Sequence, residues 1–203
     1  MRYETFQRFI DPPLAFMLLL VGLPLWLVAT LAAALDQGVP FFFQTRIGHH
    51  NKPFRLLKLR TMRLPQPGDR CEADRITQTG YFLRRSGLDE WPQLINILRG
   101  EMTWIGPRPL LPHYLPWYTA EERYRHAVKP GITGLAQVRG GNALPWPERL
   151  ALDVEYVRRK SFAFDLLILS KTVFFVTRRL QRNGDPTQDV MPFNEWAKQH
   201  RND

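Results

Sequence analysis

Residues 12–35 of this 203-residue chain have the sequence PPLAFMLLLVGLPLWLVATLAAAL. The segment has 24 residues and no charge, and as a helix it would be about 36 Å long. The hydrocarbon core of a bilayer is about 30 Å thick. A buried helix of a soluble protein would carry a polar stripe, whereas this segment offers only Thr30. A cleaved signal peptide fits less well, because its apolar region has about 7–15 residues. The segment therefore predicts insertion into a membrane.

Gly22 and Pro24 interrupt the apolar segment near its middle. Proline removes a backbone donor and clashes with the carbonyl group four residues earlier, and glycine loosens the same turn. Each of the two arms would be about 17 Å long, roughly half the thickness of the bilayer. One possible outcome is a kinked helix that spans the membrane. The other is a re-entrant hairpin that dips into one leaflet and returns, and these residues alone leave both open.

The charge is distributed very unevenly along the chain. The net charge is +9, and because residues 1–36 hold two arginines against three acidic residues, residues 37–203 carry +10. Positive charge beside a membrane segment favours the cytoplasmic side, and a strongly basic body indicates an anionic partner. Nucleic acid is disfavoured as that anionic partner, because the chain has neither an aromatic RNA-binding motif nor a recognisable DNA-reading helix. The single cysteine, Cys71, excludes an intramolecular disulfide framework.

The remaining pattern predicts an α+β fold that is mainly helical. Residues 39–48 and 54–62 have the alternation of a β-hairpin, with a turn between them. Residues 64–79 are polar and predict a loop, and the later helical stretches lie near 147–160 and 164–182. The second of these stretches predicts either a packed helix or an amphipathic helix on a membrane surface, with Leu166, Leu169, Val173 and Val176 on one stripe. The predicted division is a membrane-inserted segment (1–36), a cytoplasmic catalytic domain (37–185) and a C-terminal tail (186–203).

The most informative stretch is SGLDEWPQLINILRGEMTWIGPRP, residues 86–109. Its apolar residues recur at helical spacing from Trp91 to Leu98, and Gly100 is a natural stop. Proline is tolerated only in the first turn of a helix, so Pro92 predicts a start near Asp89.

An acidic pair, Asp89 and Glu90, therefore lies at the predicted helix N-terminus. The helix amides, with Arg84 and Arg85 nearby, are expected to favour an ionised Asp89. An ionised, oriented aspartate can attack phosphorus or bind a divalent metal. A simple capping role for Asp89 remains open on these residues alone. The adjacent pair His49–His50 has no third ligand at a suitable spacing, so a turn is predicted there instead of a metal site.

Beyond these features, the chain resembles the bacterial sugar transferase family, the monotopic phosphoglycosyl transferases of membrane glycan assembly. The resemblance covers roughly residues 5–180 in the correct order, beginning with the apolar segment. Its other motifs are Phe54-x-x-x-Lys58-x-Arg60-Thr61-Met62, Asp89-Glu90-x-Pro92-Gln93-x-x-Asn96-x-Leu98-x-Gly100-x-Met102, Ile105-Gly106-Pro107-Arg108-Pro109, Lys129-Pro130-Gly131-Ile132-Thr133-Gly134-x-Ala136-Gln137 and Asp153-x-x-Tyr156.

The resemblance implies a specific reaction. Such enzymes move a sugar 1-phosphate from a UDP-sugar to a polyprenyl phosphate, usually undecaprenyl phosphate, and release UMP. Carried over to this chain, Asp89 is the nucleophile that forms a covalent phosphosugar intermediate in a ping-pong mechanism. Asp89 is also the ligand of an assisting Mg²⁺, and Glu90 assists the acceptor phosphate as a base or by positioning. The expected phosphate-binding residues are Lys58, Arg60, Arg84, Arg108 and Arg139.

The resemblance also favours the re-entrant topology, at the cytoplasmic face of the inner membrane of a bacterium. The lipid bilayer is then a partner, and downstream glycosyltransferases would extend the product in exopolysaccharide, O-antigen, capsule or glycoprotein synthesis. Members of the family often carry serine before the membrane-segment proline, whereas this chain has Leu23. A non-catalytic scaffold with the same fold is disfavoured by the intact Asp89–Glu90 pair. The sugar is not specified by any of these motifs.

Overall fold

The computed structural model describes residues 3–69, 71–181 and 191–201. Its α-helices are α1 (Tyr3–Val21), α2 (Leu23–Gln37), α3 (Gln78–Ser86), α4 (Gln93–Leu98), α5 (Ala120–Arg123), α6 (Leu135–Arg139), α7 (Trp146–Arg159), α8 (Phe162–Gln181) and α9 (Phe193–His200). The strands are β1 (Phe41–Ile47), β2 (Pro53–Leu59), β3 (Thr103–Ile105) and β4 (Gly131–Thr133). Helices dominate and the sheets are small, which confirms the predicted mainly helical α+β class.

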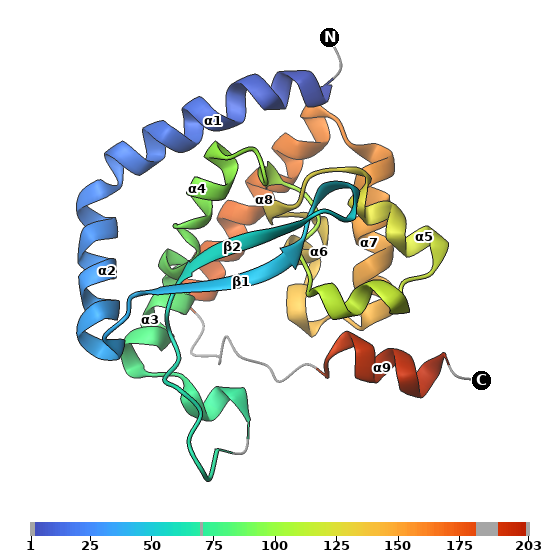
Figure 1. Cartoon of the computed structure of the whole chain (residues 1–203). Helices are drawn as coiled ribbons and strands as arrows, with labels where there is room; N and C mark the ends of the chain where they lie inside the picture. The colour runs from blue at the N-terminus through green and yellow to red at the C-terminus, as the bar shows by residue number, and fades with distance from the viewer. Residues whose placement is uncertain (1–2, 70, 182–190, 202–203) are drawn as a thin grey trace.

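Strands β1 and β2 form the predicted hairpin, which crosses the middle of the molecule (Figure 1). The strands are antiparallel, with Phe42 opposite Lys58 and Arg46 opposite Phe54. His50 and Asn51 take positive φ angles of 53° and 60° in the connecting turn. Asparagine and histidine tolerate this region better than most residues. Residues 49–51 therefore form a turn, as predicted, and the ring of His49 binds the carbonyl oxygen of Ala127.

Strands β3 and β4 form a second, parallel pair that fixes the segment after β3. The two backbones approach so closely that a Cβ atom on Gly131 would lie 2.1 Å from the backbone nitrogen of Gly106. Only glycine permits such an approach. The N–H of Gly106 donates to the carbonyl oxygen of Thr133, and the N–H of Gly131 donates to that of Pro107. These contacts hold the backbone that leads into Arg108.

Helix α9 packs onto the body of the protein. Phe193 and Ala197 are fully buried in a cluster with Leu110, Tyr114, Tyr118, Trp146 and Leu150. Arg201, just after the helix, forms an ion pair with Glu122. Residues 193–201 of the predicted tail thus belong to the packed body, whereas the predicted boundary at residues 185 and 186 lies outside the described residues.

Helices α1 and α2 bend by 71° at Gly22, as the sequence predicted. Among the described residues, no single helix is long and apolar enough to cross a membrane, although this bent pair is by length and composition. Figure 1 shows the pair as an arc at one side of the molecule, opposite α5, α7 and α9.

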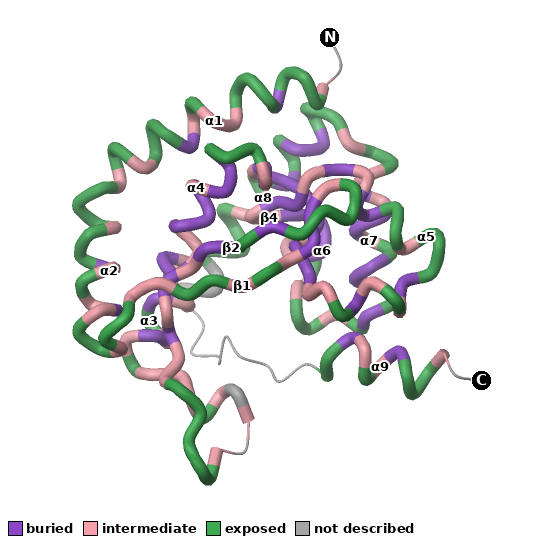
Figure 2. Tube along the Cα trace, viewed as in Figure 1, coloured by how far each residue is buried: buried purple, intermediate pink, exposed green. Residues whose placement is uncertain are grey.

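Helices α1 and α2 leave many large apolar side chains exposed. In Figure 2 these two helices are mostly coloured as exposed or intermediate, whereas much of α4 and parts of α7 are coloured as buried. The exposed side chains include Phe9, Phe16, Val21, Leu25, Val28, Leu31 and Leu35. The stripe that the sequence predicted on α8 is exposed too, since Leu166, Leu169, Val173 and Val176 are all more than one-third accessible. Helix α8 packs on the body through Phe164 and Ile168 instead, so the predicted stripe is not the face that packs. Exposed apolar surface of this extent marks an interaction surface.

A tryptophan ring fills the space at the bend. A Cβ atom on Gly22 would lie 1.9 Å from Cζ3 of Trp91 and 2.9 Å from the carbonyl oxygen of Leu18. We expect Gly22→Ala to cost about 1–3 kcal/mol, because overpacking displaces neighbouring groups. Thermal unfolding in detergent measures this. In a double-mutant cycle with Trp91→Leu the cost of Gly22→Ala should fall, and an unchanged cost would show that the ring does not determine the fit.

Candidate active site

The acidic pair lies in a short 3-10 turn, Leu88–Glu90, between α3 and α4. Gly87 ends α3 with a φ of 74°, a left-handed conformation that glycine adopts readily. Helix α4 begins at Gln93, after Pro92, so the predicted helix starts about one turn later than expected. Asp89 makes no capping hydrogen bond to either element. The capping interpretation of Asp89 is therefore wrong.

Two cations converge on Glu90. Lys58 Nζ from β2 donates to Glu90 Oε1 at 2.7 Å, and Arg108 Nη2 donates to the same oxygen at 2.7 Å. Burial alone would raise the pKa of Glu90, but Arg108 and Lys58 outweigh it and hold the pKa well below its ordinary range. Glu90 thus stays ionised and keeps both cations beside Asp89. A carboxylate with so low a pKa is a poor general base.

Asp89 is buried, with 7% of its surface exposed. Burial raises the pKa of its carboxyl group above the ordinary value, while Lys58, Arg84 and Arg108 act in the opposite direction. Arg84 does favour the ionised form, as expected from the sequence, but desolvation is larger, so the pKa of Asp89 is raised overall. Among the described residues, no side chain donates a hydrogen bond to the Asp89 carboxylate. Its oxygens therefore remain available for chemistry.

The structure brings three of the five predicted phosphate-binding residues to the acidic pair. Lys58 and Arg108 bind Glu90, and Arg84 is close enough to lower the pKa of Asp89 while its Nε donates to Thr61 Oγ1 at 2.8 Å. Arg60 lies just beyond β2 and Arg139 ends α6. Within the described part of the chain, neither of these two side chains contacts either carboxylate.

Asn96, which is fully buried on α4, ties that helix to β2. Its Oδ1 accepts from the backbone N–H of Leu57 at 3.2 Å, and its Nδ2 donates to the carbonyl oxygen of Arg55 at 2.8 Å. Because Lys58 follows Leu57 and Glu90 precedes α4, these bonds hold the lysine and the acidic pair in register.

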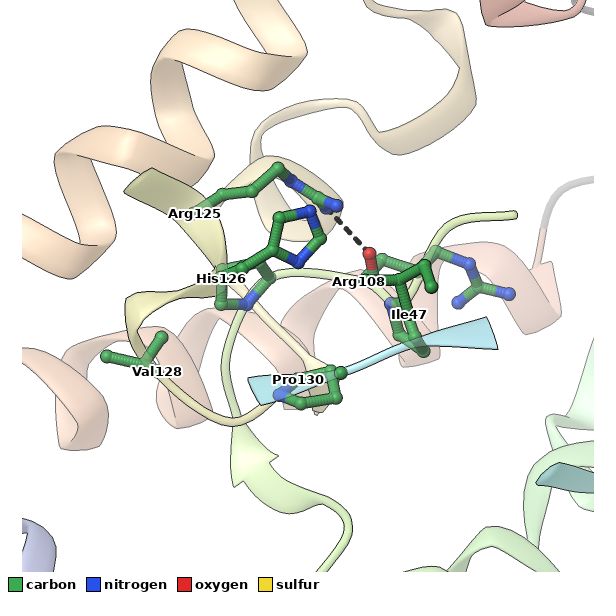
Figure 3. A pocket seen from close by; sticks show the side chains of 9 residues that line it. Ile47, Arg108, Arg125, His126, Val128 and Pro130 are labelled. Carbon is green, nitrogen blue, oxygen red and sulfur yellow. Dashed lines mark hydrogen bonds between the residues drawn. The ribbon is translucent and has the colours of Figure 1, made fainter. Parts of the chain in front are cut away.

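Two residues of α7, Asp153 and Tyr156, hold the segment that carries Arg108, Asp153 through Arg125 and Tyr156 directly. Arg125 donates through Nε and Nη2 to Asp153 Oδ2 at 3.0 and 2.7 Å, and its Nη2 also donates to the carbonyl oxygen of Arg108 at 2.7 Å (Figure 3). Tyr156 Oη, one turn after Asp153, donates to the carbonyl oxygen of Ile105 at 2.7 Å. No role was predicted for Asp153 or Tyr156 from the sequence, although their i, i+3 spacing places them on one face of a helix. None of the sequence motifs includes Arg125.

The acidic pair provides little for a metal ion by itself. The described residues contain no group of three His, Cys, Asp or Glu side chains that could hold one, and Glu90 already binds two cations. Mg²⁺ is commonly held by one or two carboxylates together with substrate phosphates and water. The unpaired carboxylate of Asp89 fits that kind of site, with a phosphate-containing substrate supplying the other ligands.

Comparisons with known proteins agree with the motifs. A sequence profile of the family described as bacterial sugar transferase matches residues 2–179. An uncharacterized sugar transferase of Bacillus subtilis, EpsL, is 44% identical over 189 residues, which are 90% of this chain and 94% of that protein. The UDP-glucose:undecaprenyl-phosphate glucose-1-phosphate transferase of Caulobacter vibrioides is 40% identical, over 82% of this chain and 68% of that protein.

A third relative is the undecaprenyl-phosphate galactose phosphotransferase of Salmonella typhimurium, which is 33% identical over 85% of this chain and 40% of that longer protein. The profile match spans most of the sequence and includes the acidic pair, the Arg108 segment and α7. The chain belongs to the bacterial sugar transferase family.

Proposed function

We propose that this protein transfers a sugar 1-phosphate from a UDP-sugar to a polyprenyl phosphate, releasing UMP. The observation that carries the proposal is the buried, unpaired carboxylate of Asp89 beside a glutamate that holds two cations. The names of the Caulobacter and Salmonella relatives support the acceptor class and the type of group transferred. Because those names differ in the sugar, the donor sugar is left open.

The first step is a displacement at the β-phosphorus of the donor. An oxygen of Asp89 forms a bond to this phosphorus, and the bond from phosphorus to the bridging oxygen breaks, so that UMP leaves with the electron pair. Burial removes the water that would otherwise solvate the attacking oxygen. Lys58, Arg84 and Arg108 lie where they can stabilise the charge that develops on the phosphate oxygens.

In the second step an oxygen of the polyprenyl phosphate attacks the same phosphorus and frees Asp89. Glu90 acts by positioning: its low pKa makes it a weak base, and it fixes Lys58 and Arg108 around the phosphate. The two substrates then bind in turn, which predicts ping-pong kinetics. Mg²⁺ held by Asp89 and the donor phosphates would neutralise negative charge on the diphosphate.

Contacts at both ends of the bent helix pair support a re-entrant topology. At the start of α1, Tyr3 Oη and Gln7 Nε2 donate to Asp165 Oδ2 on α8 at 2.5 and 3.0 Å. At the end of α2, Thr77 Oγ1 donates to Asp36 Oδ2 at 2.5 Å. Since both ends bind the same body, the exposed apolar arc between them would enter one leaflet and return. The positive charge of the body supports a location of this site at the cytoplasmic face of the membrane.

The topology predicts where a label can reach the N-terminus. In a Cys71→Ser background, a cysteine introduced by Thr5→Cys should be labelled by a membrane-impermeant reagent only after the cells are permeabilised. His50→Cys, in the exposed hairpin turn, is the control that reports on which side of the membrane the body of the protein lies. Labelling of intact cells at Thr5→Cys alone would show that α1 and α2 span the membrane.

The test of the function is UMP release. The purified protein with undecaprenyl phosphate and Mg²⁺ should release UMP from at least one member of a panel of UDP-sugars, and chelation should stop the release until Mg²⁺ is restored. A non-catalytic scaffold would bind a UDP-sugar without releasing UMP, and a nucleic-acid-binding protein would do neither. The product would be a lipid-linked sugar phosphate, the substrate of downstream glycosyltransferases that extend a glycan.

A further inference from the structure

Arg46 lies on the same face of the hairpin as Lys58. Directly opposed residues of an antiparallel pair point to one face, and Lys58 opposes Phe42, four residues before Arg46. At about 3.3 Å per residue the two positions are about 13 Å apart along the strand. Arg46 lies at the end of β1 away from α2.

The Arg108 segment connects these two ends of the hairpin. The side chain of Arg108 binds Glu90, and the carbonyl oxygen of the next residue, Pro109, accepts from Arg46 Nη1 at 3.3 Å. Arg46 Nη2 also donates to Gln44 Oε1, whereas its Nε is buried with no hydrogen-bond partner among the described residues. A buried N–H of a charged group without a partner is costly.

Arg149, on α7, supplies a third guanidinium group in addition to those of Arg46 and Arg108. The residue is only 7% exposed, and its guanidinium lies over the ring of Trp146 at 4.6 Å. Its side chain forms no hydrogen bond or ion pair with any described residue. Asp153, one turn later, is engaged by Arg125. Arg149 is therefore a buried cation without a carboxylate partner.

The charges of the three guanidinium groups affect one another's pKa. Burial, followed by repulsion from Arg108, lowers the pKa of Arg46 to about 10 and that of Arg149 to about 10. Arg46 and Arg149 also repel each other less strongly. Three mutually repelling cations, two of them lacking a carboxylate, are an arrangement that a bound anion would stabilise.

We propose that Arg46, Arg108 and Arg149 bind the phosphate of the UMP part of the donor, which becomes the leaving group. This inference rests on the proposed function. In an in-line attack by Asp89, the α-phosphate lies on the side of the β-phosphorus away from Asp89. The Arg108 segment leads from Glu90 to Arg46, and the charge of Arg149 acts on both Arg46 and Arg108. A polyprenyl phosphate would approach from the exposed apolar face of α2, which adjoins the opposite end of the hairpin. The leaving UMP gains negative charge as the bond breaks, and these cations stabilise it.

Binding measurements on the full-length protein in detergent test this without turnover. UMP and uridine are titrated into the native protein, Arg149→Gln and Arg46→Gln. Each substitution should weaken UMP binding by about tenfold, since a hydrogen-bonded charge is removed, and should change uridine binding less than twofold. Arg158→Gln is the matched control: it removes the same charge from α7 at an exposed pair with Glu121, and should leave UMP binding unchanged.

The other outcomes contradict the proposal in distinct ways. Unchanged UMP binding, or equal losses for UMP and uridine, would show that the cluster does not bind the phosphate. Normal UMP binding with slower discharge of the phosphosugar intermediate by polyprenyl phosphate would assign the cluster to the lipid phosphate. If Arg149→Gln does not fold, Arg149→Lys, which keeps the charge but not the planar fork, should show a smaller loss. Native protein that binds UMP but releases none from any UDP-sugar would refute the proposed function and leave the subsite standing.

Discussion

Asp89→Asn is expected to abolish both the covalent intermediate and UMP release. The substitution keeps the size of the side chain and removes the charge that attacks phosphorus, so turnover should fall by at least about a thousandfold. Incubation of the native protein with a UDP-sugar alone should add the mass of a sugar phosphate to the peptide containing Leu88–Arg99, and Asp89→Asn should show no such adduct. Mass spectrometry of the digested protein makes the measurement.

The stability of Asp89→Asn separates loss of chemistry from loss of fold. The Asp89 carboxyl is buried without a hydrogen-bond partner among the described residues, and burial raises its pKa. A neutral amide is less costly to bury than a carboxylate, so the variant should unfold at the same temperature as the native protein or higher. Near-normal UMP release by a folded Asp89→Asn protein would refute the covalent mechanism.

Asp153→Asn is expected to have the largest effect on stability. The Arg125–Asp153 pair is almost completely buried, with 1% and 4% of the two side chains exposed. Removing one partner leaves a buried charge unpaired, which costs about 3–5 kcal/mol. Thermal or denaturant-induced unfolding in detergent measures this cost. Activity should fall as well, because Arg125 also binds the carbonyl oxygen of Arg108 and so helps to place the cation that holds Glu90.

Glu121→Gln provides the matched comparison for Asp153→Asn. Arg158 and Glu121 form an ion pair at 2.8 Å with 61% and 66% of their side chains exposed. Because water screens such a pair, its loss should cost no more than about 1 kcal/mol. Equal costs for Asp153→Asn and Glu121→Gln would mean that burial does not set the strength of the Arg125–Asp153 pair.

Local features of this protein followed directly from its sequence. The break at Gly22, the hairpin and its turn at residues 49–51, and the stop at Gly100 are all present in the structure. Each depends on the backbone preferences of one or two residues, or on the spacing of apolar side chains along a short segment. The acidic pair was likewise identified because its motif is one continuous stretch of sequence, and the family resemblance depends on such continuous motifs.

The properties of the site, by contrast, were set only by the tertiary structure. The pairs Lys58–Glu90, Arg108–Glu90 and Arg125–Asp153 join residues 32, 18 and 28 positions apart. The low pKa of Glu90 and the raised pKa of Asp89 depend on those partners and on how much water the fold excludes. The sequence supplied the ionisable groups. Only the packing of distant elements decided their burial and spacing, and these quantities determine the free energy of each charge.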